Sequence, residues 1–426
     1  MIIVDRALAQ RQAEGRPVRV AMVGAGAMGR ANTFQILQCT PGMALVAIAN
    51  RTPDNAVRAY REAGVDDVAT VGDAGALARA MAAGRPAVTD DPSLLCAADG
   101  VDVVLEVTGA VEFGAAVVLD AIDHGKHVVT MNAELQGTLG PVLHRHAERA
   151  GVVLSDSDGD QPGVIMNLYR FVQGLGVRTV LAGNMKGLQD AYRTPTTQAE
   201  FARKGGLSPQ MATSFADGTK MSFEMALVAN ATGLRVRAGG MLGPTCADVH
   251  EAAGFFALDE LLDGAGLVDY VVGAEPAPGV FVLGYETRPL QTHWLRMYKQ
   301  GDGPIYTFYT PYHLCHLEVP TSVARVALFG DPIVAPTCGH VVDVVATAKR
   351  DLRAGEVLDG IGYYLTYGQC VNADDVAAGR LLPMGLSEGC TLTRDVPADQ
   401  LLTYDDVTVP ADRLADRLRA EQAAQT

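Results

Sequence analysis

The stretch SFADGTKMSFEMALVANATGL (Ser214–Leu234) places a lysine between two carboxylates. Apolar residues recur in it at helical spacing, which predicts a helix. On that helix Asp217, Lys220 and Glu224 share one stripe, because residues three and four positions apart lie on the same face. Such an ammonium can give a proton to a carbonyl oxygen or hold the alkoxide that forms there. The alternative is a solvated face with an ion pair, which would stabilise the helix by about 0.2–0.5 kcal/mol.

A second lysine, Lys186 in the motif GNMKG, ends a predicted strand nearer the N-terminus. Lysine suits acid–base chemistry because its pKa shifts readily when the side chain is partly buried. We therefore expect Lys220 and Lys186 to handle protons in an active site. Asp217 and Glu224 would orient the ammonium of Lys220 and favour its charged form. The alternative for both lysines is a surface side chain whose methylene groups cover apolar neighbours.

Two histidines and a glutamate follow in the motif YTPYHLCHLEVP. His313 is a candidate substrate ligand, although a buried core histidine fits the same pattern. The spacing of His313, His316 and Glu318 is not a zinc motif on a strand, because residues three positions apart point to opposite faces. A hard divalent cation would prefer the carboxylates of Asp217, Glu224 or Glu318. We assign no metal ligand, and a divalent metal stays an open alternative.

A glycine-rich turn follows the β-rich run Val18–Val23 and opens a predicted helix. A strand, then G-x-G-x-x-G, then a helix within a βαβ unit is the context typical of dinucleotide binding. The first glycine permits the tight turn, the second lets the backbone approach the pyrophosphate, and the third lets helix and strand pack closely. The helix N-terminus then offers N–H groups to the phosphates. The predicted phosphate-binding residues are Gly24, Gly26, Ala27, Met28 and Gly29.

The second predicted strand, Ala44–Thr52, indicates which dinucleotide is bound. An acidic residue at its end would accept hydrogen bonds from the ribose of NAD, but this strand ends in Asn50, Arg51 and Thr52. Arginine pairs with a 2′-phosphate and stacks on adenine. The pattern therefore predicts NADP(H), bound by Asn50 and Arg51. The alternative is that Arg51 is an ordinary surface charge and that Asp54 binds the ribose.

Polar residues also close two later strands, in the motifs EVTGA and TMNAE. Ligands bind at the carboxyl ends of the strands in open α/β sheets. We therefore expect these residues to lie beside the nicotinamide half of the cofactor, although each of them could instead only cap a helix. The candidates are Thr108, Gly109, Asn132 and Glu134.

Strands and helices alternate through the first part of the chain, which predicts an α/β fold with a doubly wound parallel sheet of the Rossmann type. The elements expected after the second strand are a helix Asp54–Ala63, a strand Val101–Gly109, a helix Gly114–His124, a strand His127–Asn132 and a helix Leu139–Ala150.

The rest of the chain follows a different pattern. Its middle part mixes strands and helices without strict alternation, so an α+β substrate domain is expected. Short strands and turn signals then predict a small β-rich module. The expected boundaries are 1–160 for the NADP-binding domain, 161–335 for the catalytic and dimerisation domain, 336–412 for the β-rich module and 413–426 for the C-terminal tail.

Composition argues against several classes of function. The formal net charge is −15 and no run of lysines or arginines occurs, whereas binding nucleic acid requires a basic surface. The seven cysteines form no C-x-x-C pair, and their odd number fits a reducing compartment. The N-terminus lacks the pattern of a signal peptide, and no apolar run reaches the ~18 residues of a membrane span. We therefore expect a cytoplasmic protein that binds neither nucleic acid nor membrane.

Several motifs together resemble known families. The order GAGAMG, EVTGA, HVVTMNAE and DSDGDQPG resembles the nucleotide-binding domain of the homoserine dehydrogenase type. GNMKGLQD, DGTKMSFEMALVANATGL and YTPYHLCHLEVP resemble the deoxyxylulose-5-phosphate-reductoisomerase-like (DRL) family. The tail, which includes AKRDLRAGEVLDGIGYY and LPMGLSEGCTLTRDVPADQLLTYDDV, resembles an SAF module.

The resemblance implies a homodimeric NADP(H) oxidoreductase that acts on a small, often phosphorylated, hydroxy-carbonyl compound. The best-known activity of this kind converts 1-deoxy-D-xylulose 5-phosphate to 2-C-methyl-D-erythritol 4-phosphate, with a metal that orients adjacent oxygens. Homoserine dehydrogenases typically have a lysine where this chain has Ala133, and their second lysine follows an acidic residue, whereas Lys220 precedes Glu224. The alternatives are a homoserine-dehydrogenase-like enzyme of a dedicated biosynthetic pathway and a non-catalytic sensor of nucleotide and metabolite.

Overall fold

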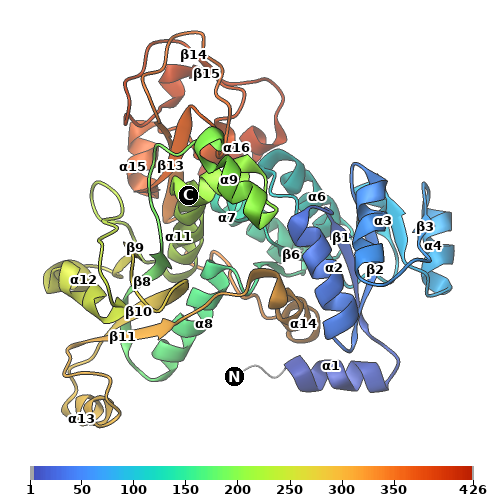
Figure 1. Ribbon diagram of the computed structural model, residues 1–426, viewed down its shortest axis with the longest axis horizontal. Coiled ribbons are helices and arrows are strands. Elements are labelled where there is room, and N and C mark those ends of the chain that lie inside the picture. The colour runs from blue at the N-terminus through green and yellow to red at the C-terminus, as the bar shows by residue number, and fades with distance from the viewer. Residues whose placement is uncertain (1–3, 425–426) are drawn as a thin grey trace. The chain divides into compact units, whose positions relative to one another are not determined.

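The computed structural model describes residues 4–424 of the chain (Figure 1). They divide into two compact units. Unit 1 holds residues 4–160, 314–335 and 417–424, and unit 2 holds residues 161–313 and 336–416. None of the helices in residues 4–424 combines the length and the apolar composition that crossing a bilayer requires.

Unit 1 contains a sheet of seven strands whose order is β3-β4-β2-β1-β5-β6-β7, and all of its paired strands run parallel. The strands are β1 (Val18–Val23), β2 (Met43–Ala49), β3 (Ala69–Thr70), β4 (Ala87–Thr89), β5 (Val103–Glu106), β6 (His127–Thr130) and β7 (Leu154–Asp156). The chain builds outward from β1 on one side and then from β5 on the other, so the doubly wound topology predicted from the sequence is confirmed.

Helices connect these strands and lie beside the sheet, as the blue and teal part of Figure 1 shows. They are α1 (Val4–Ala13), α2 (Ala27–Cys39), α3 (Pro53–Glu62), α4 (Ala74–Ala82), α5 (Pro92–Ala97), α6 (Val111–Asp123) and α7 (Ala133–Ala150). The return segment of unit 1 adds η2 (Cys315–Leu317) and α14 (Val319–Phe329). The elements β3, α4, β4 and α5 are absent from the sequence prediction. The two strands among them have two and three residues, which is too short to show a period.

The strand register brings the polar residues at the strand ends to one edge of the sheet. Val23 at the end of β1 pairs with Ala49 of β2 and with Glu106 of β5. Glu106 in turn pairs with Thr130 of β6. The loops after β1, β2, β5 and β6 therefore leave the sheet at the same level. The order of the strands reverses between β1 and β5, which is where open α/β sheets bind ligands.

Helix α7 contains a proline at position 141, which interrupts the helical hydrogen bonds around it. Two side chains of α16 (Leu414–Ala424) bind to the backbone near this break. Arg419 donates to the carbonyl oxygen of Thr138 at 3.2 Å, and the N–H of Val142 donates to Oε1 of Gln422 at 3.2 Å. The C-terminal helix, part of the tail expected at 413–426, therefore supports α7, whose N-cap is Asn132. Residues 425–426 lie outside the described residues.

We predict that the stability of unit 1 depends on pH, because α7 contains a histidine, His144, with a shifted pKa. Burial lowers the pKa of His144 to about 3. His144 therefore takes up a proton near pH 6.5 in the unfolded chain but only near pH 3 in the folded protein. The free energy of unfolding consequently falls as the pH drops from about 6.5 towards 3. We expect a loss of about 1 kcal/mol per pH unit between pH 6 and 4 from this group. Hydrogen exchange of the α7 amides should show it, and His144→Phe should reduce the pH slope. An equal slope in both proteins would contradict this prediction.

Unit 2 contains a four-stranded sheet in the order β11-β10-β8-β9, in which only β8 and β9 run parallel. Its strands are β8 (Arg178–Lys186), β9 (Leu267–Val272), β10 (Gly279–Tyr285) and β11 (Ile305–Thr310). Its helices are α8 (Gln161–Gly174), α9 (Pro195–Gly205), α10 (Pro209–Ala216), α11 (Thr219–Thr232), α12 (Leu258–Leu262) and α13 (Pro289–Met297), with η1 (Val249–Phe255). Helices α8 and α11 pack against this sheet.

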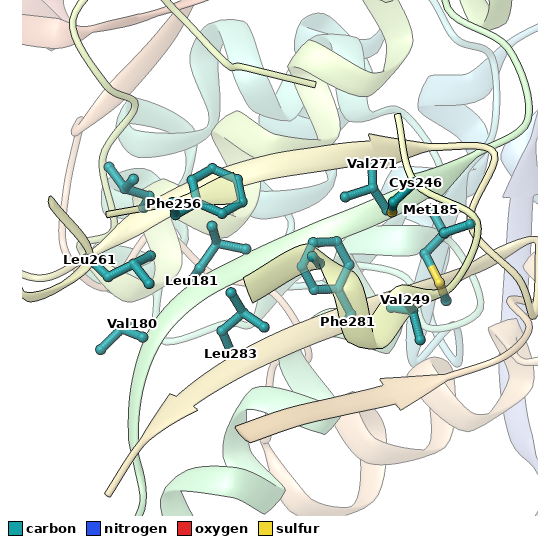
Figure 2. Packing of buried hydrophobic residues seen from close by; sticks show 13 residues of the cluster. Val180, Leu181, Met185, Cys246, Val249, Phe256, Leu261, Val271, Phe281 and Leu283 are labelled. Carbon is teal, nitrogen blue, oxygen red and sulfur yellow. The ribbon is translucent and has the colours of Figure 1, made fainter. Parts of the chain in front are cut away.

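The two faces of the β8 strand differ in chemistry because successive side chains alternate. Leu181 and Met185 enter an apolar cluster together with Phe281 of β10, and the cluster is shown in Figure 2. The cluster also takes in residues of η1 and α12. Asn184 and Lys186 lie at alternate positions to these residues, and both bind a side chain of α11. The sheet is therefore apolar on one face and carries polar groups under α11 on the other.

The last part of unit 2 is built from short β elements. It contains β12 (Val342–Ala348), β13 (Thr366–Asn372), β14 (Thr391–Leu392) and β15 (Val407–Thr408), with α15 (Ala373–Gly379), η3 (Met384–Leu386) and η4 (Tyr404–Asp406). The pairs β12–β13 and β14–β15 are antiparallel, and α11 packs against the first of them. Small sheets near the C-terminus agree with the β-rich character expected there, and the SAF resemblance stays a prediction.

The structure corrects one element of the sequence prediction. The stretch Ser214–Leu234, expected to be helical, is interrupted between α10 and α11 by Asp217 and Gly218. Gly218 has φ +87°, and a Cβ there would overlap the side-chain amide of Gln189. A residue with a side chain would be strained in this conformation, so glycine ends one helix and permits the other to start.

Candidate active site

The glycine turn after β1 has the geometry that a dinucleotide requires. Gly24 has φ +113°, which favours glycine, and its N–H donates to the carbonyl oxygen of Ala49 at 2.9 Å. No atom lies within 4 Å of the position that a Cβ would take at Gly26, so the backbone is open there. A Cβ at Gly29 would overlap the carbonyl oxygen of Gly24. The three glycines thus permit the turn, leave space above it and let α2 pack closely on β1.

The N-terminus of α2 leaves its first N–H groups available to a ligand. Its N-cap is Gly26, which has no side chain to accept from them, and no acidic residue lies in the first turn. Ala27 and Met28, the first residues of the helix, are partly exposed. Uncapped N–H groups with the positive end of the helix dipole form an anion site. We propose that these two residues, with the glycines, hold the phosphates of the cofactor.

Asn50 shapes the loop between β2 and α3. Its Oδ1 accepts from the N–H of Ala25 at 3.0 Å, and its Nδ2 donates to the carbonyl oxygen of Thr52 at 2.8 Å. Asn50 therefore connects the glycine turn to the loop that carries Arg51. Arg51 is exposed and forms no ion pair with any described residue. Asp54 is also exposed, in the first turn of α3. The alternative that Asp54 binds the ribose therefore stays open.

A buried glutamate connects the ends of β5 and β6. One carboxylate oxygen of Glu106 accepts from the N–H of Thr108 at 2.8 Å and from the hydroxyl of the same residue. The other accepts from Nδ2 of Asn132 at 2.9 Å. Burial raises the pKa of Glu106, and these hydrogen bonds oppose the rise. Asn132 also caps α7, because its Oδ1 accepts from the N–H of Leu135 at 3.1 Å.

The structure thus brings together the strand-end candidates of unit 1. Thr108 and Asn132 contact the same carboxylate, Gly109 follows in the exposed loop, and Glu134 lies partly exposed in the first turn of α7. Glu106 itself was not selected from the sequence. The signal for it was a charged residue at the end of a strand that is otherwise apolar, in the motif EVTG.

In unit 2, a second buried glutamate joins Lys186 to α11. The Nζ of Lys186 lies 3.4 Å from Oε2 of Glu224, whose side chain is 2% exposed. The same oxygen accepts from Nδ2 of Asn184 at 2.9 Å. Lys186 keeps 14% of its side chain exposed. A partly exposed ammonium oriented by a buried carboxylate is suited to proton transfer. Asn184 was not selected from the sequence, although it lies two residues before Lys186 and therefore on the same face of β8.

Asp217 has a different partner from the one expected. It was expected to flank Lys220, but its Oδ2 accepts from Nζ of Lys349 at 2.9 Å, and its Oδ1 accepts from the N–H of Thr219. Lys349 also donates to the carbonyl oxygens of Arg193 and Tyr363. Burial raises the pKa of Asp217, and the charge of Lys349 opposes the rise. A buried ammonium with three acceptors is a structural connection between the α10–α11 corner and the β-rich part.

The structure also places the two remaining candidates of unit 2, Lys220 and His313. Lys220 is partly exposed in the first turn of α11, and His313 is partly exposed three residues after β11. Residues 4–424 contain no group of three or more histidine, cysteine, aspartate or glutamate side chains arranged to hold a metal ion. In unit 2, Lys186 thus lies beside Glu224, and Lys220 lies one turn before Glu224 on the same helix.

In a comparison with known proteins, two family models match consecutive parts of the chain. Residues 24–155 match the family model of the homoserine dehydrogenase NAD-binding domain, and residues 159–319 match that of the catalytic domain of oxidoreductase DRL. The chain is 38% identical over 102 residues to homoserine dehydrogenases of Mycobacterium bovis and Mycobacterium tuberculosis. This alignment covers 24% of the chain and 23% of each relative, so the chain spans less than a quarter of their length.

Solved structures with a similar course of the backbone include dehydrogenases and reductases. A probable dehydrogenase from Thermotoga maritima is 15% identical, with 76% of this chain and 92% of that chain covered and a TM-score of 0.42. The biliverdin reductase of Synechocystis sp. PCC 6803, crystallised with biliverdin and NADP+, is 14% identical, with 74% and 92% covered and a TM-score of 0.37.

The two matched domains are of the kind found in NAD(P)-dependent oxidoreductases. More particularly, the chain carries a homoserine dehydrogenase-type NAD-binding domain followed by the catalytic domain of oxidoreductase DRL. The two resemblances predicted from the motifs in the first and middle parts of the chain are confirmed.

Proposed function

We propose that the protein is an NADP(H)-dependent oxidoreductase that reduces a small hydroxy-carbonyl compound. The observation that carries the proposal is the strand-end edge of unit 1. It combines an open glycine turn, an uncapped helix N-terminus and an arginine where an NAD-specific site would have a carboxylate. The match of residues 159–319 to an oxidoreductase catalytic domain supports hydride chemistry rather than binding alone.

Unit 2 supplies the groups that handle the proton in this proposal. Reduction of a carbonyl places negative charge on its oxygen, and an ammonium stabilises that charge and donates the proton. Lys220 is the proposed donor, and Lys186, held by Glu224 at 3.4 Å, is the proposed second ammonium. His313 is a proposed substrate ligand. Asp217 is proposed to act through the position of α11, because its carboxylate is already bound to Lys349 and Thr219.

The cofactor preference rests on Arg51. Arg51→Asp replaces the proposed partner of the 2′-phosphate with a group of the same charge as the phosphate. We therefore expect the Kd for NADPH to rise by at least tenfold, which is about 1.4 kcal/mol of binding free energy. The Kd for NADH should change little or fall. Isothermal titration of both cofactors measures it. Arg58→Asp, at an exposed arginine of the following helix α3, is the control. An unchanged preference would assign the ribose to another residue, with Asp54 the first candidate.

The substrate class follows from a panel assay. NADPH oxidation should be measured with phosphorylated ketoses and unphosphorylated hydroxy-aldehydes, and NADP+ reduction with homoserine, each with and without a divalent metal. Turnover of a phosphorylated ketose with skeletal rearrangement would establish a reductoisomerase, and oxidation of homoserine would establish the dehydrogenase alternative. Tight NADPH binding without turnover of any compound would favour the sensor.

The proposal also covers the cellular compartment, the oligomeric state and the C-terminal module. All seven cysteines are free thiols, which supports a reducing, cytoplasmic compartment. A homodimer and an SAF-type C-terminal module are proposed from the sequence resemblance, and sedimentation of the purified chain tests the first of them.

A further inference from the structure

Glu106 is a buried carboxylate whose hydrogen-bond partners within residues 4–424 are all neutral donors: the N–H and hydroxyl of Thr108 and the side-chain amide of Asn132. Burial removes this carboxylate from water and raises its pKa, so holding it ionised costs free energy. A neutral residue could cap the same loops without that cost. The position therefore calls for a reason beyond the stability of the sheet.

The carboxylate determines the direction of every hydrogen bond around it, because an ionised carboxylate accepts and cannot donate. The hydroxyl proton of Thr108 is directed to Glu106, so the hydroxyl oxygen can offer only lone pairs to its surroundings. One of these faces the N–H of Ala110 at a long 3.4 Å. Thr108 is partly exposed, so its oxygen is accessible to a ligand.

The same carboxylate fixes the orientation of the Asn132 amide. Nδ2 donates to Glu106 and to the carbonyl oxygen of Ala110, so Oδ1 is the oxygen that caps Leu135. The loop after β5 and the start of α7 after β6 are thereby held to one another at the edge of the sheet where ligands bind.

We propose that Glu106 is a positioning residue for the cofactor: it turns the oxygen of Thr108 outward as a hydrogen-bond acceptor and locks the two adjoining loops. The group it prepares the site for is a hydrogen-bond donor of the nicotinamide nucleoside, such as a ribose hydroxyl or the carboxamide NH2. This inference rests on the proposed dinucleotide function of unit 1.

The test exploits donor and acceptor chemistry at one contact. Glu106→Gln keeps size and shape but places an NH2 against either Asn132 or Thr108, so we expect the Kd for NADPH to rise at least tenfold. Adding Asn132→Asp restores an acceptor opposite the new NH2, and the double variant should recover at least half of the lost affinity on a logarithmic scale. Glu148→Gln, on the exposed end of α7, should bind like wild type.

The possible outcomes distinguish the proposed role of Glu106 from the proposed dinucleotide-binding function of unit 1. Failure of the wild-type chain to bind either dinucleotide would defeat the proposed function. Normal affinity in Glu106→Gln, or no recovery in the double variant, would overturn the role of Glu106 while leaving the cofactor site in place. If Glu106→Gln does not fold, Thr108→Val and Thr108→Ser decide: the valine should lose affinity by at least tenfold and the serine should keep it, and equal binding by both overturns the inference.

Discussion

Lys220→Met is expected to lower kcat of the NADPH-dependent reduction by about 10²–10⁴-fold, the range that a positioned general acid contributes. The Kd for NADPH should not change, because the cofactor is proposed to bind to unit 1 and Lys220 lies in unit 2. Steady-state kinetics with the best substrate of the panel, together with cofactor titration, measure the two effects separately.

A second lysine of unit 2 provides the matched control. Lys204 is 67% exposed and pairs with Glu200 on the surface of α9, so Lys204→Met should change neither quantity. Lys186→Met is the informative comparison. A larger loss of kcat than in Lys220→Met would move the proton-donating role to the Lys186–Glu224 pair. Full activity in both variants would remove lysine from the mechanism.

Lys349→Met is expected to destabilise unit 2 by about 3–5 kcal/mol, the cost of leaving one member of a buried ion pair without its partner. The variant strands the carboxylate of Asp217 in a buried site and removes the donor to the carbonyl oxygens of Arg193 and Tyr363. Trp294 is the single tryptophan of the chain and lies in unit 2, so its fluorescence during urea unfolding reports on this unit.

A second substitution separates the charge from the packing. Asp217→Asn in the Lys349→Met background removes the stranded charge and keeps an oxygen for the N–H of Thr219. The double variant should regain a substantial part of the lost stability. If the single variant unfolds within about 1 kcal/mol of wild type, the pair behaves as an exposed one does and the structural role assigned to it is wrong.

Local sequence patterns predicted the parts of this molecule that depend on local physics. The run Val18–Val23 and the glycines after it define a buried strand and a phosphate turn through their own backbone requirements, and the structure has both. The break in the helical stretch was also readable, since an Asp-Gly pair is a turn signal. The apolar spacing on either side of this pair continues the helical pattern and therefore masks the turn signal.

Partners that are far apart in the sequence could not be predicted in the same way. Asp217 and Lys349 are separated by 132 positions, and no period or motif links them. Glu106 and Asn132 meet only because β5 and β6 are neighbours in register. The strand ends could be predicted to share an edge, but the choice of hydrogen-bond partners along that edge depends on side-chain packing in three dimensions.

The central claim is that unit 1 binds NADP(H) on the turn from Gly24 to Gly29, and calorimetric titration tests it most directly. Wild-type protein should bind NADPH saturably and at least tenfold more tightly than NADH, a difference of about 1.4 kcal/mol. Gly26→Val should abolish binding, because its side chain would enter the open space above the turn, where a Cβ meets no atom within 4 Å. Absence of saturable binding of either dinucleotide to the wild-type chain, or undiminished binding to Gly26→Val, would contradict the account.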